Sequence, residues 1–324
     1  MAPTNLKPLT TPILLPEING QLPAKRLIIL AGAGGTGARV AQALPKLLAP
    51  GDAIAVVDPD IVEERNLLRQ HFTYEDVGKH KAEVVALRVQ AALPPAFQES
   101  IKVFSIPTRL EAISLNTLWT AMYELLGGRD RAIYTICLGC VDRASARRAL
   151  HDQSANLFRG TSRIWIDAGN GVRTGQVILS FSSMGVKFPM QILTHRDDYG
   201  RATTTNHNDY KFATASFDGV ARYAPELLID DPDDVEQAEG CALRLDTQSV
   251  SANQMAATLV ISMLSTILSG GAVDHPHVQF STDPLMVKGE LFPTASRHTM
   301  ARYGVPWVPL PLPGEPTRKE EEEA

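Results

Sequence analysis

The chain is most constrained by an apolar run at residues 27–31, just after Arg26, that leads directly into closely spaced glycines. These glycines are Gly32, Gly34, Gly35 and Gly37, and Thr36 lies between the last two. The run predicts a buried strand, and the residues after it begin a helix whose free backbone N–H groups face the space above the turn. A Cβ atom at the glycines would block both the turn and the approach of a phosphate to the backbone. The pattern therefore predicts a phosphate-binding turn, the alternative being a plain turn of a parallel sheet that binds nothing.

Further apolar segments predict more strands, and stretches with helical periodicity lie between them. The strands are expected at residues 53–57, 101–106, 132–138 and 163–171, and residues 174–180 are expected to return as an antiparallel neighbour. The helix after the glycine turn is expected to continue to about residue 49, with a bend at Pro45. This order predicts an α/β fold, a Rossmann-like doubly wound mixed sheet in a single elaborated domain.

Changes in composition divide the chain into five parts. Residues 1–24 contain five prolines and are expected to form an extended arm, while residues 25–181 form the nucleotide-binding Rossmann-like core. Residues 182–240 lose any pattern and are expected to be a crossover or lid-like insertion. Residues 241–304 add a long apolar helix and strands that complete the domain, and the proline- and glutamate-rich residues 305–324 are expected to be a disordered tail.

Composition excludes several classes of function. The net charge of -5 and the pI near 5.9 give no basic surplus for nucleic acid. No apolar run is expected to span a bilayer, and the N-terminus lacks the order of a signal peptide, so no membrane partner is expected. Three cysteines are too few for a disulfide framework, which favours a reducing, cytoplasmic location.

The segment after the second predicted strand contains polar residues suited to a nucleotide. Asp58 lies 21 positions after Gly37, where a Rossmann-type site places the acid that accepts hydrogen bonds from ribose. Arg69 offers a fork of donors for phosphate oxygens, and Lys81 supplies a compact positive charge. The sequence up to Asp58 fits an NAD enzyme and an ATP enzyme equally well. Arg69 and Lys81 suit a triphosphate, the alternative being that they are ordinary solvated charges.

Three motifs in this segment narrow the choice. D-x-D-x-V at residues 58–62, N-L-x-R-Q at 66–70 and D-x-G-x-x-K-A at 76–82 resemble, in order and spacing, the nucleotide site of the ThiF/HesA/MoeB family. These E1-like enzymes adenylate the C-terminal glycine of ubiquitin-like or sulfur-carrier proteins. The resemblance implies a ThiF/E1-like fold, ATP and Mg²⁺ as cofactors, a glycine-tailed partner protein and a homodimer. It also assigns the roles of several residues: Asp58 holds the ribose, Asn66 orients the phosphates, Arg69 and Lys81 neutralise them, and Asp60 and Gln70 are adjacent members of the site.

The fourth predicted strand carries Asp142 to the carboxyl edge of the sheet, where open α/β folds bind their ligands. In the family this strand ends in a Cys/Thr-Asp pair followed by an arginine, and Asp142 with Arg147 resembles that pattern, although Val141 precedes the aspartate. Asp142 is therefore the candidate ligand for Mg²⁺, with water and phosphates completing the octahedron. An N-cap of the following helix is the alternative role.

The cysteines do not predict a zinc site. Cys137 and Cys140 form a C-x-x-C, but only Cys241 remains elsewhere, and structural zinc commonly needs two such pairs. Small packing residues are the preferred interpretation of the pair. By resemblance to E1-like enzymes, Cys241 is a candidate thioester nucleophile, with a small packing residue as the alternative.

The departures from the family leave other hypotheses open. Residues 1–25 lack the N-terminal R-x-x-R-Q segment whose arginine reaches across the dimer in bacterial members. The G-C-A-L segment at 240–243, followed by N-Q and an alanine-containing helix, resembles the ThiF-like proteins of the plasmid-associated PRTRC system. The leading hypothesis is an E1-like adenylyltransferase. The alternatives are a degenerate ThiF-fold binding module without turnover, an NAD-dependent oxidoreductase, and an enzyme that adenylates a small molecule or a tRNA-borne carboxylate.

Overall fold

The computed structural model describes most of the predicted core and parts of the chain beyond it. The described residues are 25–114, 117–118, 120–121, 124, 133–156, 163–183, 194–196, 202–204, 215–217, 219–229, 249–268, 273 and 275–290. The predicted arm (1–24), the tail (305–324), most of the predicted insertion and Cys241 lie outside these residues.

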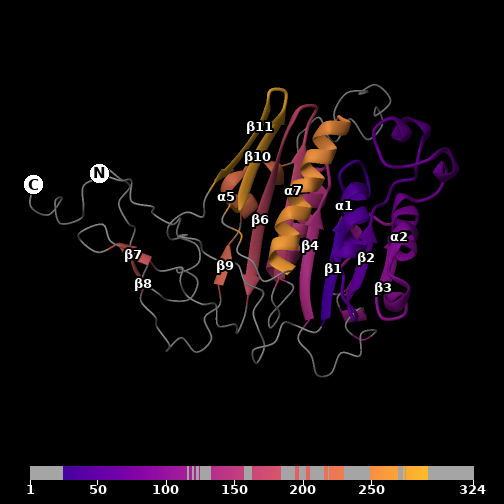
Figure 1. Cartoon of the computed structure of the whole chain (residues 1–324), viewed down its shortest axis with the longest axis horizontal. Helices are drawn as coiled ribbons and strands as arrows, with labels where there is room; N and C mark the ends of the chain where they lie inside the picture. The colour runs from indigo at the N-terminus through magenta and orange to yellow at the C-terminus, as the bar shows by residue number, and fades with distance from the viewer. Residues whose placement is uncertain are drawn as a thin grey trace, which may run out of the picture.

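A mixed sheet runs through the middle of the described structure (Figure 1). Its parallel half has the strand order β3-β2-β1-β4-β5. These strands are β1 (Lys25–Ala31), β2 (Ala53–Val57), β3 (Lys102–Ile106), β4 (Ile133–Gly139) and β5 (Arg163–Asn170). The order reverses between β1 and β4, so the carboxyl ends of these two strands border the crevice in which such sheets bind ligands.

The antiparallel half continues from β5 as β6-β10-β11, with β9 paired to the far end of β6. The strands are β6 (Thr174–Ser183), β9 (Ala215–Phe217), β10 (His277–Thr282) and β11 (Leu285–Glu290), and a separate small pair joins β7 (Thr194–Arg196) to β8 (Ala202–Thr204). The predicted antiparallel return after β5 is therefore confirmed, with a turn closed by the Gly171 N–H on the Thr174 carbonyl at 2.9 Å.

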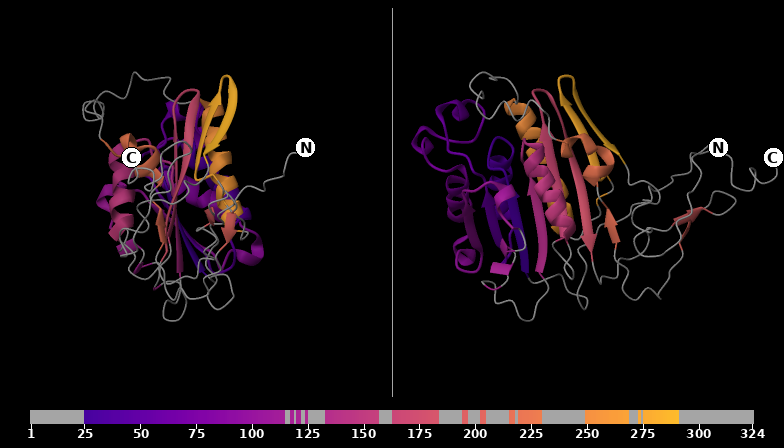
Figure 2. Two further views of the ribbon diagram at one scale, coloured as in Figure 1. Left: turned by 90° about the vertical axis from the view of Figure 1, so that its left-hand side faces the viewer. Right: turned by 180° about the vertical axis from the view of Figure 1, so that it is seen from behind.

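Helices cover both faces of the sheet (Figure 2). One face carries α1 (Gly37–Ala43), α2 (Lys81–Ala92) and α7 (Val250–Leu268), and the other carries α4 (Ala144–Asn156) and α5 (Gly219–Tyr223). Short 3₁₀ turns complete the elements: η1 (Leu44–Lys46), η2 (Glu64–Leu68), η3 (Tyr74–Asp76), η4 (Pro95–Phe97), η5 (Leu110–Ala112) and η6 (Pro225–Leu228). The Rossmann-like doubly wound mixed sheet is thus confirmed.

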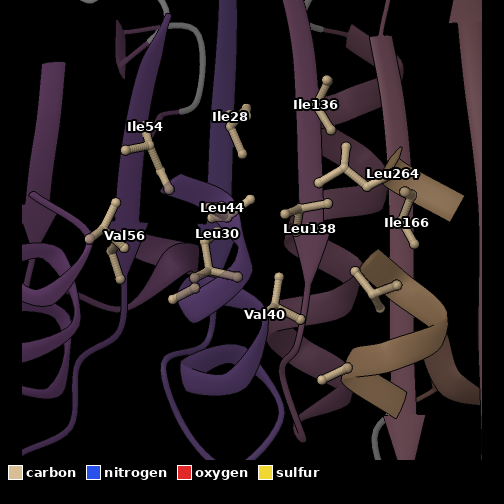
Figure 3. Close-up of a cluster of buried hydrophobic side chains, with 14 of the residues drawn as sticks. Ile28, Leu30, Val40, Leu44, Ile54, Val56, Ile136, Leu138, Ile166 and Leu264 are labelled. Carbon is tan, nitrogen blue, oxygen red and sulfur yellow. The ribbon is translucent and has the colours of Figure 1, made fainter. Parts of the chain in front are cut away.

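The alternation of side chains along β1 builds two cores at once. Ile28 and Leu30 point toward the face covered by α1, α2 and α7, where Figure 3 shows them among buried aliphatic side chains. Leu27 and Ile29 point to the opposite face, against α4 and α5. All four side chains are at most 1% exposed. This explains why the strand reads as a continuous apolar run rather than an alternating one.

The first helix is shorter than expected. It ends at Ala43 and passes into η1, in which Pro45 occupies the second position. Proline has no backbone N–H and its ring displaces the carbonyl four residues earlier, so the α-helical ladder stops here instead of bending.

Helix α7 is long and apolar, with 19 residues and a mean hydropathy of 1.3, enough by length and composition to cross a membrane. The structure instead packs it against β5, β6, β10 and α1, and Leu264 and Ile267 on its inner face are fully buried. This packing accounts for its composition as that of a core helix. Its N-terminal turn also brings Asn253 up against the glycine turn.

Candidate functional site

A cleft of about 1100 Å³ runs along the carboxyl edge of the sheet. One half is lined by the glycine turn and the loops after β2 and β4, and the other by the ends of β5, β6 and β10. The predicted residues that line it are Gly32, Gly34, Gly35, Thr36, Asp58, Asp60, Asn66, Arg69, Gln70, Lys81 and Asp142. Gly37 is buried behind them at the start of α1, and Cys241 lies outside the described residues.

The glycine turn is held tightly where it leaves β1. Gly32 has a φ of +90°, its N–H donates to the Val57 carbonyl at 2.8 Å, and an added Cβ would lie 2.4 Å from the Cys140 carbonyl oxygen. A larger residue is therefore excluded by both conformation and space. The next backbone N–H groups, at Gly34, Gly35 and Thr36, donate to no acceptor among the described residues and border the cleft. Unpaired N–H groups in a turn of this kind suit an anion.

Asp58 supports the turn from the end of β2. Its two carboxylate oxygens accept the N–H groups of Ala33 at 2.6 Å and of Asp60 at 2.8 Å. Burial raises the pKa of Asp58, and the nearby positive charge of Lys81 and the two backbone hydrogen bonds only partly oppose that shift. The carboxylate is 6% exposed and borders the cleft, so its remaining lone pairs are placed to accept hydroxyl donors from a ligand.

Backbone hydrogen bonds join the D-x-D-x-V motif to the D-x-G-x-x-K-A motif. The Val62 N–H donates to the Lys79 carbonyl at 2.8 Å, and the Gly78 N–H donates to the Val62 carbonyl at 2.9 Å. Gly78 has a φ of +86°, which explains the glycine of the D-x-G-x-x-K-A motif. This backbone pairing brings the Lys81 ammonium to 2.9 Å from the Asp60 carboxylate. Lys81 is only 5% exposed, so its charge is directed at the cleft and not into bulk solvent.

The N-L-x-R-Q motif forms the turn η2 and the residues just after it. The Asn66 side-chain oxygen accepts the Glu63 N–H at 2.9 Å, so this buried amide closes its own turn. The Asn66 carbonyl in turn accepts the N–H groups of Arg69 at 3.2 Å and Gln70 at 2.8 Å. Asn66 thus fixes the backbone from which Arg69 and Gln70 reach the cleft. The side-chain oxygen is used in this contact, and the amide nitrogen is the group that could donate to a phosphate, so the expected role of Asn66 stays a prediction.

Gln70 has an unused acceptor. Its Oε1 atom is buried and has no hydrogen-bond partner among the described residues. The same amide lies 3.7 Å from the position that a Cβ of Gly34 would take. This buried acceptor beside the glycine turn is available to a donor group of a ligand.

Asp142 lies in the loop after β4, exposed and on the wall of the cleft. No group of three or more acidic, histidine or cysteine side chains suited to a metal occurs among the described residues. A single free carboxylate fits Mg²⁺ only if phosphate and water oxygens supply the other ligands, which is the manner in which Mg²⁺ is commonly bound with nucleotides. Asp142 therefore suits the predicted role in chemical type and in place.

Arg147 does not face the cleft as a free cation. Its Nε donates to the Asp167 Oδ2 at 2.8 Å and an Nη donates to the Val141 carbonyl at 2.7 Å. Both side chains are buried, at 4% and 1% exposure. Burial raises the pKa of Asp167, and Arg147 opposes the shift. The pair ties the Asp142 loop to β5, a role that the sequence did not reveal.

Neither of the two described cysteines is in a disulfide. Cys137 is buried within β4, and Cys140 lies at its end beside the glycine turn. Burial raises the pKa of the Cys140 thiol far above its usual value, and the charge of Asp167 adds to this. Cys140 is thus protonated at neutral pH and unsuited to act as a nucleophile.

Two polar residues that sequence reasoning missed lie against the turn. Thr36 Oγ1 is 3.0 Å from Asn170 Oδ1 and 3.3 Å from Asn253 Oδ1. The Asn170 amide nitrogen donates to Asn253 Oδ1 at 3.0 Å. Asn253 comes from α7 and Asn170 from the end of β5. No sequence motif indicates these contacts, because Thr36 is more than a hundred positions from both asparagines.

Comparisons with known proteins give structural matches of low sequence identity. No curated protein matches the chain. A crystal structure of PaaA has 15% sequence identity and a TM-score of 0.44, covering 83% of this chain and 64% of PaaA. E. coli MccB with ATP has 16% identity and a TM-score of 0.44, covering 82% and 62%. The microcin C7 biosynthetic enzyme MccB in complex with N-formylated MccA has 16% identity and a TM-score of 0.46, covering 82% and 64%.

The chain spans less than two thirds of the length of these solved proteins. At such low identity the likeness concerns the fold alone. The match to a family model extends over much more of the sequence than the three motifs. The ThiF family model matches residues 20–273, which confirms the resemblance predicted from the motifs, and the chain belongs to the ThiF family.

Proposed function

We propose that this protein is an ATP-dependent adenylyltransferase that activates the C-terminal carboxylate of a partner protein. The observation that carries the proposal is that one cleft holds both the unpaired N–H groups of the glycine turn and the side chains of Asp58, Arg69, Lys81 and Asp142. Family membership supports the same reaction class. A ubiquitin-like or sulfur-carrier protein that ends in glycine is the proposed acceptor.

The nucleotide half of the cleft offers a complementary group for each part of ATP. Asp58 accepts the ribose hydroxyls, and the free N–H groups of the turn receive phosphate oxygens. Lys81 and Arg69 offset the negative charge of the triphosphate, as in other phosphoryl-transfer sites. Mg²⁺ held by Asp142 would share that charge and neutralise the leaving pyrophosphate.

In the reaction, an oxygen of the acceptor carboxylate attacks the α-phosphorus and the bond from that phosphorus to the bridging oxygen of the β-phosphate breaks. An acyl-adenylate forms and pyrophosphate leaves with the electron pair. The attacking group is itself an anion, so the cations of the cleft must reduce the repulsion as it approaches. Lys81 is well suited because Asp60, its present partner, is 58% exposed and can be rehydrated when the ammonium turns to phosphate.

The acceptor half of the cleft has room for a polypeptide tail. A Cβ added at Gly171 would have no atom within 4 Å, and one at Gly169 would meet only the Arg147 guanidinium at 3.6 Å. Both glycines border the cleft between the turn and the ends of β6 and β10. An extended chain could therefore lie close to the backbone here, with its carboxylate directed toward the phosphates.

The proposal extends to the assembly and the location. We also propose a homodimer and a cytoplasmic location, which the family resemblance and the small number of cysteines support, and the PRTRC branch as the subgroup. A Cys241 thioester would be a separate step after adenylation. Size-exclusion chromatography with light scattering tests the dimer, and trapping of a reductant-sensitive adduct tests Cys241.

Ligand-induced thermal stabilisation tests the nucleotide site directly. Purified protein is heated with ATP, AMP or NAD, with and without Mg²⁺, and a specific ligand at a hundredfold excess over its Kd should add about 2.7 kcal/mol to the free energy of unfolding. Stabilisation by ATP that depends on Mg²⁺ is expected in the wild type and should disappear in Arg69→Ala. Arg173→Ala, which removes an exposed arginine of the β5–β6 turn, is the matched control and should respond like the wild type.

The other outcomes discriminate among the alternatives. Stabilisation by NAD alone would replace the proposal with an oxidoreductase. A lack of response to every nucleotide would favour a degenerate module that binds a partner without turnover. If ATP stabilises the protein and pyrophosphate exchange occurs only with a small carboxylic acid, the acceptor is a small molecule and not a protein.

A further inference from the structure

A buried polar network lies directly behind the glycine turn. It joins three elements that are far apart in the sequence: Thr36 at the start of α1, Asn170 at the end of β5 and Asn253 in the first turns of α7. Asn253 is fully buried, whereas Thr36 and Asn170 border the cleft on its two sides. The network therefore lies between the nucleotide half and the acceptor half of the cleft.

The contact between Asn253 and the turn is close. A Cβ added to Gly35 would lie 2.3 Å from the Asn253 Nδ2 atom and 2.7 Å from its side-chain carbon. An alanine at position 35 would therefore have to displace the buried Asn253 amide, whatever binds in front of the turn. The backbone N–H of the same glycine is one of those that remain free for a ligand.

The hydroxyl of Thr36 is used in an unusual direction. A threonine just before a helix commonly caps the helix with its side chain, but Thr36 makes no side-chain cap on α1. Its hydroxyl instead lies 3.0 Å from Asn170 Oδ1 and 3.3 Å from Asn253 Oδ1. Because one hydroxyl carries one proton, the two amide oxygens share it, and the turn is tied sideways to β5 and α7.

The Asn253 amide is only partly satisfied. Its Oδ1 accepts the Asn170 Nδ2 at 3.0 Å, but its own Nδ2 is buried and has no partner among the described residues. An unpaired buried donor is costly, so apolar packing alone would favour an alanine or leucine here. The reason for a polar side chain at this position therefore lies in its contacts with Thr36 and Asn170.

We infer that Asn253 is a positioning residue that fixes the phosphate-binding turn relative to the end of β5, and so sets where ATP lies with respect to the acceptor tail. This inference rests on the proposed function for its consequence, but the positioning itself is a property of the free protein. Helix α7 is a suitable anchor because it is packed on β5, β6 and β10. Displacement of a bound group by about 1 Å is enough to cost about a hundredfold in rate at such sites.

The first test uses amide hydrogen exchange of the free protein. In Asn253→Ala, the peptide that contains residues 32–40 should exchange about tenfold faster, since the turn loses its anchor. Two controls accompany it. Gln254→Ala removes an exposed amide of the same helix, and Met263→Ala removes a buried α7 side chain that packs in the main core away from the turn. Neither should change exchange of that peptide beyond its global effect on stability.

The second test measures the affinity for ATP by calorimetry. Asn253→Ala should weaken ATP binding by about tenfold, whereas Met263→Ala, although destabilising, should leave it within about twofold. Thr36→Val should weaken binding alone but add little to Asn253→Ala, because both remove the same network. The pair Thr36→Val and Met263→Ala should be additive. A merely structural role of Asn253 predicts additivity in both pairs.

If Asn253→Ala does not fold, Asn170→Ala and Thr36→Val remove the other ends of the network at the cleft surface, and each should loosen the same peptide. Unchanged exchange of residues 32–40 in a folded Asn253→Ala protein overturns the inference whatever the activity. A wild-type protein that binds no ATP overturns the proposed function instead, and leaves the exchange result to decide the role of Asn253.

Discussion

Replacing Arg147 with methionine gives a direct measure of the buried ion pair below the cleft. The variant keeps a long apolar side chain but removes the cation 2.8 Å from the Asp167 Oδ2. Asp167 is 1% exposed and its other oxygen, Oδ1, already has no partner among the described residues. Breaking a buried pair in this way leaves an uncompensated charge and typically costs about 3–5 kcal/mol of unfolding free energy. We expect a loss in that range at pH 8.

The loss should depend on pH in a defined direction. The pKa of Asp167 in the folded protein is raised by burial although Arg147 opposes the shift, and without Arg147 it must rise further. Above the unfolded pKa of about 4 the folded state then binds more protons than the unfolded state, so stability falls as pH rises through the folded pKa. Arg147→Met should therefore be destabilised least near pH 5, where Asp167 takes up a proton, and most at pH 8.

Urea unfolding followed by far-UV circular dichroism at pH 5, 6.5 and 8 measures this difference. The double variant Arg147→Met with Asp167→Asn is the control, since it removes the buried charge together with its partner and should recover most of the loss at pH 8. An equal loss at all three pH values, or no recovery in the double variant, would refute the argument that an unpaired buried carboxylate is responsible.

Three further predictions concern the cleft itself. Gly32→Ala should lower the unfolding free energy by at least about 2 kcal/mol in the same urea assay, because a residue with a φ of +90° is strained and its Cβ would lie 2.4 Å from a carbonyl oxygen. Gly171→Ala is the control. Its Cβ would meet nothing within 4 Å, so the unfolding free energy should change by less than about 0.5 kcal/mol. Lys81→Met should weaken ATP binding by about tenfold or more in calorimetry, while costing under about 1 kcal/mol of stability because its partner Asp60 is exposed; retained affinity would remove Lys81 from the site. Asp142→Asn should abolish the part of the ATP-induced thermal stabilisation that requires Mg²⁺ and leave the part measured in EDTA unchanged, and an intact Mg²⁺ dependence would contradict its assignment as the metal ligand.

The nucleotide half of the cleft was predictable because its determinants are local. Asp58 and Lys81 lie within 25 residues of each other, in one segment whose backbone folds back on itself through Val62, Lys79 and Gly78. The glycine turn follows a strand that is apolar at every position from Leu27 to Ala31, which fixes its place at the carboxyl edge of the sheet. Contacts between residues that are close in sequence depend mainly on the local pattern, so the motifs indicate where these residues lie.

The remaining contacts were not predictable, since tertiary packing chooses the partners. Asn253 is 217 positions from Thr36, and the helix that carries it reads only as apolar. Arg147 was noted only as the arginine that follows Asp142, and its burial beside Asp167 could not be deduced from the sequence. The contact of the Asn66 side-chain oxygen with the Glu63 N–H is likewise not specified by the motif. In both cases the folded chain decides which partner the polar side chain meets.

These contacts together explain how the glycine turn can be open in front and still keep one conformation. Asp58 holds the Ala33 N–H from the side of β2, the end of β4 closes on Gly32, and Asn253 packs behind Gly35. The N–H groups that face the cleft are thus held in place before a ligand arrives. Donors held in advance need little reorganisation when charge develops on a phosphate, which is the condition under which they contribute most to catalysis. It follows that removing Asn253, which packs behind the turn, should slow the reaction as much as removing a cation of the cleft such as Lys81.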